Sequence, residues 1–186
     1  MATQTEHARR LFTVEEYDRM VEAGILTKDD RVELIDGEIL VMSPIGHRHG
    51  ACVATLNELL VTKVGRRAWV WVQSSVQTAP RSKPQPDLAL LERRSYRTAG
   101  PTEANALLLI EVSESSLSYD RTVKRRLYAR AGVAELWIVD VEGEAVEVHR
   151  GPQADAYREV RRVPRGETIA PAAFPDAVIG VDEIFV

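Results

Sequence analysis

Apolar positions recur at helical spacing in three parts of the chain. The first part follows Thr13, which makes a capping-box pattern with Glu16, and its helix is expected to end at Gly24. The second spans residues 49–64, and the third runs from Asp120, taken as its N-cap, to about residue 131. Their apolar stripes are, in chain order, Val14, Tyr17 and Val21; Val53, Leu56, Leu59 and Leu60, with Lys63 at the same helical spacing; and Leu127, Tyr128 and Ala131.

Alternating positions and short apolar runs predict the strands. Residues 31–42 alternate around Asp36 and Gly37, and an Asp-Gly pair between two such runs indicates a β-hairpin. Residues 107–112, apolar apart from Glu111, are typical of a central strand buried on both faces. Other strands are expected at 69–76, 87–91, 135–140 and 145–149, followed by short strands separated by prolines. This order of elements indicates an α/β or α+β domain with a mixed sheet.

The composition fits one folded domain over residues 1–186, of which 1–10 are expected to be flexible. Apolar residues make up 45% of the chain and charged residues 28%, as in globular proteins. The single cysteine, Cys52, excludes an intrachain disulfide, fits a reducing compartment and is expected to be a buried filler. No apolar stretch is long enough for a bilayer and residues 1–12 lack a signal-peptide pattern, so a cytoplasmic protein without membrane contact is expected.

Local charge differs from the overall charge. The net charge of −4 disfavours a protein that coats nucleic acid indiscriminately. Residues 121–130 nevertheless hold five cations and no acid, and residues 158–165 hold four arginines and one acid. Such runs are either solvated faces or contacts for a phosphate backbone. Only four of the 24 basic residues are lysines, so a lysine beside candidate catalytic groups is informative.

Two carboxylates stand in apolar surroundings. Glu111 lies inside the most apolar strand, and Asp87 follows Pro86 at the start of another. If the two strands are adjacent, the carboxylates lie within about 5 Å and form an oxygen-rich notch suited to magnesium. Alternatively, each pairs with an arginine, or Asp87 caps a turn. Lys124, expected in the first turn of the following helix, could orient an attacking water or offset charge on a phosphate. The start of that helix would also favour an anion.

The order of these residues resembles a known nuclease pattern. Pro86-Asp87 followed by Glu111-Val-Ser113 resembles the PD-(D/E)XK nuclease superfamily, although its lysine usually stands where this chain has Ser113. The chain is more similar to one branch, the Uma2 family of restriction endonucleases, in which the lysine has moved to the next helix. The resemblance covers roughly residues 11–186, with matching segments at 31–38, 42–44, 49–50, 86–91, 111–116, 119–124, 127–132 and 137–140.

The resemblance implies a restriction-endonuclease-like mixed sheet flanked by helices, with a site that uses Mg²⁺ or Mn²⁺. It implies Asp87 and Glu111 as catalytic metal ligands and Lys124 as the catalytic cation. Glu33 is either a third carboxylate on the metal or an outward-facing strand residue. His49 is either close to the substrate phosphate or a surface residue at a helix start. The candidates for substrate binding are His49, Ser113, Arg121 and Arg125.

The expected function is therefore that of an endonuclease that hydrolyses DNA phosphodiester bonds with a metal-activated water, acting as a homodimer. Specificity would come from loops 43–50 and 77–86 or from a partner. The alternative is a catalytically inactive nuclease fold that binds nucleic acid or a protein, which Ser113 favours. A hydrolase of nucleotides or RNA is a third possibility. The indole rings of Trp69, Trp71 and Trp137 are expected in the core or at a dimer interface and not as platforms on which bases stack.

Overall fold

A six-stranded mixed sheet forms the centre of the computed structural model, which describes residues 9–27 and 29–185. Residues 1–8, most of the segment expected to be flexible, lie outside the described residues. The strand order is β3-β4-β5-β6-β7-β8, and every neighbouring pair is antiparallel except β5 and β6. The strands are β3 (Ala68–Val72), β4 (Leu88–Glu92), β5 (Ala106–Ser113), β6 (Glu135–Asp140), β7 (Ala145–Gln153) and β8 (Ala156–Pro164).

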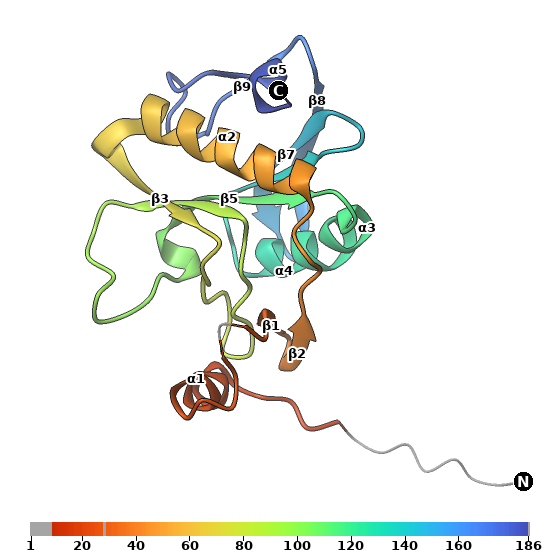
Figure 1. Ribbon diagram of the computed structural model, residues 1–186. Helices are drawn as coiled ribbons and strands as arrows, with labels where there is room; N and C mark the ends of the chain where they lie inside the picture. Colours follow the sequence, from red (N-terminus) through yellow and green to blue (C-terminus); the bar gives the residue numbers. More distant parts are fainter. Residues whose placement is uncertain (1–8, 28, 186) are drawn as a thin grey trace, which may run out of the picture.

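Helices cover both faces of this sheet (Figure 1). The long helix α2 (His47–Val64) lies on one face, where β9 (Thr168–Ile169), β10 (Ile179–Gly180) and α5 (Val181–Ile184) join it. The other face holds α3 (Leu117–Tyr119), the π-helical turn η3 (Asp120–Lys124) and α4 (Arg125–Arg130). The 3-10 turns η1 (Gly65–Arg67) and η2 (Glu103–Asn105) precede β3 and β5. None of the helices within the described residues is long and apolar enough to cross a membrane.

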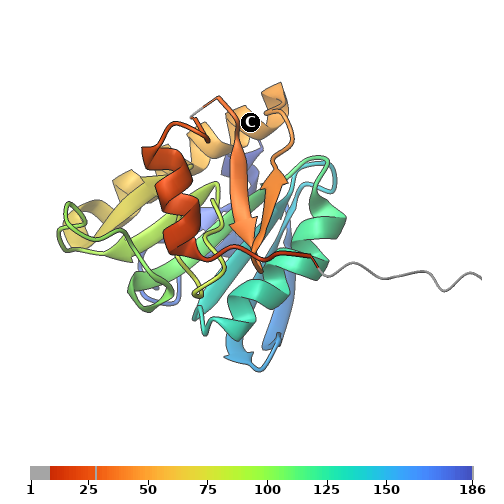
Figure 2. The same ribbon diagram turned by 90° about the horizontal axis from the view of Figure 1, so that it is seen from below.

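A β-hairpin and the first helix are added to the α4 side of the sheet. The hairpin consists of β1 (Val32–Ile35) and β2 (Glu38–Val41), and α1 (Val14–Glu22) lies beside it (Figure 2). The predicted turn is confirmed, because Asp36 and Gly37 have φ of 49° and 87°. The predicted capping box is also present, with both Thr13–Glu16 hydrogen bonds.

Two apolar clusters, one on each face, account for most of the core. Leu56 and Leu60 of α2 pack on Leu90 and Ile110 on one face, and Tyr128 packs on the other. The buried Cys52 confirms its expected role as a filler. Trp137 is fully buried, whereas Trp69 is 40% exposed on the edge strand β3 and is not a core residue.

Several local predictions are wrong for identifiable reasons. The third helical segment begins at Leu117 and not at Asp120, whose side chain is buried in η3 and accepts hydrogen bonds from two serines. Lys124 accordingly lies in the π-helical turn and not in a first turn. The short strands expected after residue 149 include the nine-residue strand β8, whose polar residues suit an exposed sheet edge. Val21, expected in an apolar stripe, is 48% exposed.

The most deeply buried carboxylate of the sheet, Glu135, holds the C-terminal segment to β6. Its Oε1 accepts hydrogen bonds from Trp137 Nε1 (2.9 Å) and from Arg150 Nε and Nη2 (2.9 and 2.7 Å). Its Oε2 accepts one from the backbone N–H of Ala172 at 2.6 Å. Arg150 is therefore the counter-charge of a fully buried carboxylate.

We expect Arg150→Ala to lower the free energy of unfolding by about 3 kcal/mol, because it leaves the Glu135 carboxylate buried and unpaired. Arg161→Ala is the matched control, since Arg161 pairs with Glu167 at the surface and its removal should cost about 0.5 kcal/mol. Urea unfolding of both variants measures the difference. Equal losses would show that Glu135 does not depend on Arg150.

Candidate active site

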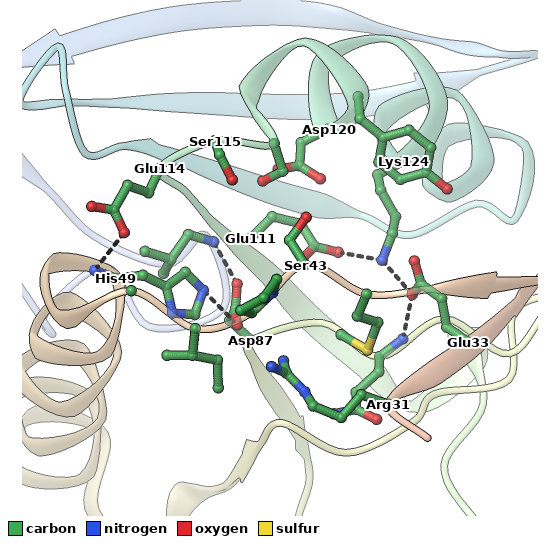
Figure 3. A pocket seen from close by; sticks show the side chains of 18 of the residues that line it. Arg31, Glu33, Ser43, His49, Asp87, Glu111, Glu114, Ser115, Asp120 and Lys124 are labelled. Carbon is green, nitrogen blue, oxygen red and sulfur yellow. Dashed lines mark hydrogen bonds and ion pairs between the residues drawn. The ribbon is translucent and has the colours of Figure 1, made fainter. Parts of the chain in front are cut away.

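A cavity of about 440 Å³ opens where the hairpin, the start of α2, the sheet and the turn η3 meet. Its walls carry charged side chains from all four elements (Figure 3). Five residues singled out in the sequence line it: Glu33, His49, Asp87, Glu111 and Lys124. The fold thus assembles in one place residues that are up to 91 positions apart along the chain.

Asp87 and Glu111 come together through the pairing of β4 with β5. The antiparallel register Leu88↔Ile110 puts the next residues, Asp87 and Glu111, opposite each other. Asp87 Oδ2 accepts a hydrogen bond from the backbone N–H of Val112 at 2.8 Å, and its Oδ1 lies 3.0 Å from His49 Nε2. Among the described residues neither carboxylate pairs with an arginine, so that alternative is wrong.

Lys124 is buried between two carboxylates from different elements. Its Nζ lies 2.6 Å from Glu33 Oε2 and 3.3 Å from Glu111 Oε1. Glu33 therefore faces inward, and the alternative of an outward-facing strand residue is wrong. Burial opposes the charge of Lys124, but the carboxylates of Glu111 and Glu33 outweigh it and raise the lysine pKa above its ordinary value. The ammonium group remains protonated at neutral pH.

Glu111 is the most perturbed carboxylate of the site. Burial raises the pKa of Glu111 well above its ordinary value, and Asp120, Asp87 and Glu33 raise it further, while Lys124 opposes the shift. The Tyr128 hydroxyl and the Lys124 ammonium both donate to Oε1. Within the described part of the chain no hydrogen bond reaches Oε2, so this oxygen is left for an external ligand.

His49 and Glu114 form the opposite wall. The His49 side chain faces Asp87, so it is a cavity residue and not a surface histidine at a helix start. Its hydrogen bond with Asp87 raises the His49 pKa, and burial works against this. Glu114 Oε2 accepts a hydrogen bond from the His49 backbone N–H at 3.4 Å.

Sequence reasoning missed four residues of the site: Arg31, Glu114, Asp120 and Tyr128. Asp120 looked like an N-cap, but it accepts hydrogen bonds from the hydroxyls of Ser113 (2.7 Å) and Ser116 (2.6 Å). Burial raises its pKa, and the two serines oppose the shift. Tyr128 fitted an apolar stripe, and its hydroxyl gave no separate signal.

Three of the candidates for substrate binding lie outside the cavity wall. Ser113 is buried and donates to Asp120. Arg121 donates to Glu147 through Nε (3.0 Å) and Nη2, and the Nε of Arg125 is buried without a partner among the described residues. Of the four candidates, His49 alone lines the cavity.

The donor set suits a hard cation that keeps part of its water shell. Among residues 9–27 and 29–185, no group of three or more His, Cys, Asp or Glu side chains is arranged to hold a metal ion. Glu33 Oε2 already accepts hydrogen bonds from Lys124 and from the Gln85 backbone N–H. Both oxygens of Asp87 are engaged as well, with His49 Nε2 and the Val112 N–H, so an ion would use the remaining lone pairs of the opposed pair Asp87 and Glu111; one or two carboxylates with several waters are the usual protein ligands of Mg²⁺.

Comparison with known proteins places this geometry in context. Residues 14–182 match the model of the Uma2 family, described as "Putative restriction endonuclease". The crystal structure of "a putative nuclease belonging to DUF820" from Anabaena variabilis aligns with a TM-score of 0.74 and 16% identity, over 94% of this chain and 97% of that one. The type IIG restriction endonuclease BpuSI aligns with a TM-score of 0.42 and 16% identity, over 78% of this chain and 17% of that one. No curated protein matches. The first alignment confirms the predicted fold.

We expect Glu111→Gln to stabilise the protein at pH 8 and to leave its stability unchanged at pH 4. The raised pKa of Glu111 means that the unfolded chain ionises first, so wild-type stability declines as pH rises above the ordinary glutamate value. Glutamine removes this decline while still accepting from Tyr128, and each unit of pKa shift is equivalent to about 1.4 kcal/mol.

Urea unfolding at both pH values tests this expectation, with the exposed Glu167→Gln as the control. A loss of stability at pH 8 in Glu111→Gln alone would mean that the carboxylate is a structural ion-pair partner of Lys124.

Proposed function

The chain belongs to the Uma2 family of restriction endonucleases, and from this premise we propose that it is a metal-dependent endonuclease that hydrolyses phosphodiester bonds of DNA. The observation that carries the proposal is the buried Lys124 ammonium beside Glu111, whose second oxygen faces the cavity that Asp87 also lines. A cation and two carboxylates in one cavity provide the groups that phosphodiester hydrolysis needs.

Asp87 and Glu111 would hold Mg²⁺, or Mn²⁺ in its place. When bound, such an ion lowers the pKa of a water and stabilises negative charge on the phosphate. Lys124 donates a hydrogen bond to the attacking water or to a phosphoryl oxygen, since its charge is retained. The Glu33 carboxylate, a candidate third metal ligand from the resemblance, also fixes the ammonium in place through Oε2.

The remaining charged residues bind and orient the substrate. Arg31 and His49 line the cavity, where Arg31 can donate to a non-bridging phosphate oxygen and His49 orients Asp87. Arg121 and Arg125 stand on the helical segment outside it and are suited to contacts with the phosphate backbone, which carry no sequence information. Two copies of the chain acting together could cut both strands of a duplex, and we propose such a homodimer.

A catalytically inactive fold that binds nucleic acid or a protein is the second candidate. Ser113 in place of the usual lysine favours it, and the position of Lys124 opposes it. Ser113 is turned toward Asp120, whereas Lys124 Nζ reaches Glu111 from the neighbouring helical segment. The inactive fold predicts DNA binding without cleavage and without any requirement for metal.

We expect the wild-type protein to nick or linearise plasmid DNA in the presence of MgCl₂ or MnCl₂. We expect this cleavage to stop when EDTA is added. Asp87→Asn, Glu111→Gln and Lys124→Met should each lower the rate at least about 100-fold, as the loss of a group that stabilises the transition state does. Asp155→Asn, Glu167→Gln and Lys83→Met are matched controls, since their side chains pair outside the cavity.

Circular dichroism confirms that each variant is folded. Cleavage by Asp87→Asn at the wild-type rate would reject the proposed activity. If the wild-type protein binds DNA but does not cleave it, the proposed activity is also rejected and the inactive fold is favoured.

A further inference from the structure

A second concave surface lies on the edge strand β3, away from the carboxylates. It is an open depression of about 490 Å³ whose wall combines aromatic rings and arginines. β3 forms the edge of the sheet (Figure 1), and the arginines belong to the loop that follows β4. We refer to it as the β3 surface, formed by Trp69, Trp71, Arg93, Arg94, Tyr96 and Arg97.

The rings and guanidinium groups of the β3 surface are already in contact with one another. The guanidinium carbon of Arg93 lies 3.6 Å from the centre of the Trp69 ring, and Trp71 and Tyr96 have ring centres 5.8 Å apart with their planes tilted by 58°. Trp69 Nε1 donates to the Arg94 carbonyl at 2.9 Å, which fixes the indole. A planar cation held over an indole can stack a further planar ring on its outer face with little loss of side-chain freedom.

The charge of this surface is uncompensated by nearby acids. Within the described chain, no carboxylate oxygen lies within 4.0 Å of a guanidinium nitrogen of Arg93, Arg94 or Arg97. The neighbouring Glu92 instead accepts from Asn105 Nδ2 at 3.4 Å. A two-fold contact with a second copy would bring the same arginines together without acids between them, which is unfavourable. The occupant that fits is therefore anionic and carries flat rings.

We propose that the β3 surface binds single-stranded nucleic acid, with a base stacked on the Trp69–Arg93 pair and phosphates on Arg94 and Arg97. Aromatic rings among basic side chains are the usual means of holding unpaired bases without sequence preference. Its link to cleavage rests on the proposed function. Trp69 pairs with Leu91 of β4, and Leu91 stands four residues after Asp87. Four residues of a strand span about 14 Å, which is the length of about four nucleotides of stacked DNA.

The test is the affinity for a fluorescein-labelled 20-nucleotide oligo-deoxythymidylate, measured by anisotropy in EDTA so that no cleavage is required. We expect Trp69→Ala to weaken binding about tenfold and Trp69→Phe, which keeps a stackable ring, to weaken it less than threefold. Arg93→Lys should weaken binding about as much as Arg93→Ala, because lysine keeps the charge but cannot stack. Arg19→Ala, an exposed arginine on α1, is the matched control and should bind like wild type.

Three results would overturn the proposal: wild-type affinity in Trp69→Ala, an equal loss in Arg19→Ala, or conversion of a dimer to a monomer by Trp69→Ala with unchanged affinity. The last result, seen by sedimentation, would assign the surface to a second copy. Plasmid cleavage is measured separately. Cleavage by the wild type together with unaltered oligonucleotide binding by Trp69→Ala rejects the β3 surface alone, and single-strand binding without cleavage rejects the nuclease activity alone.

Discussion

The arrangement of this molecule depends on one buried ammonium group held between two carboxylates. Lys124 joins the turn η3 to Glu33 of the hairpin and to Glu111 of the central strand. A buried ammonium group costs several kcal/mol unless it is compensated, and its nearest partner is Glu33 of the hairpin, so the hairpin has to close over the sheet in this register. The same closure makes the cavity. The contact of Lys124 with the two carboxylates therefore both holds the hairpin on the sheet and places the charged groups of the candidate site.

The sequence predicted local elements well where a local signal determines them. Asp36 and Gly37 determine the hairpin turn, and the apolar run before Ser113 determines the central strand. Prediction from the sequence failed where the same side chain fits two different local structures. Asp120 resembles an N-cap, yet the helical segment begins three residues earlier because two serine hydroxyls satisfy its carboxylate inside the fold. β8 carries arginines along an exposed edge and lacks the apolar alternation by which strands are recognised.

The candidate site was predictable in its members but not in its connections. Asp87 and Glu111 stood out because charged residues are rare in apolar strands, and their pairing follows once β4 and β5 are neighbours. The partner of Glu33 is 91 residues away, and no spacing rule reports such a contact. The π-helical turn that contains Lys124 is equally invisible in the sequence. In that turn the Arg125 N–H donates to the Asp120 carbonyl, five residues back, an irregularity that often occurs at functional sites.

The cavity and the proposed stacking surface are connected by a rigid element. β4 begins directly after Asp87 and ends directly before Arg93, and its residues Leu88 to Leu91 are fully buried and paired on both sides. The spacing between the two sites is thus set by strand geometry and not by a loop. A base held on Trp69 would orient the rest of its strand relative to the carboxylates while the protein stays still. Binding free energy gained away from the reacting phosphate can then be used to position it, which is the form of binding that raises a reaction rate.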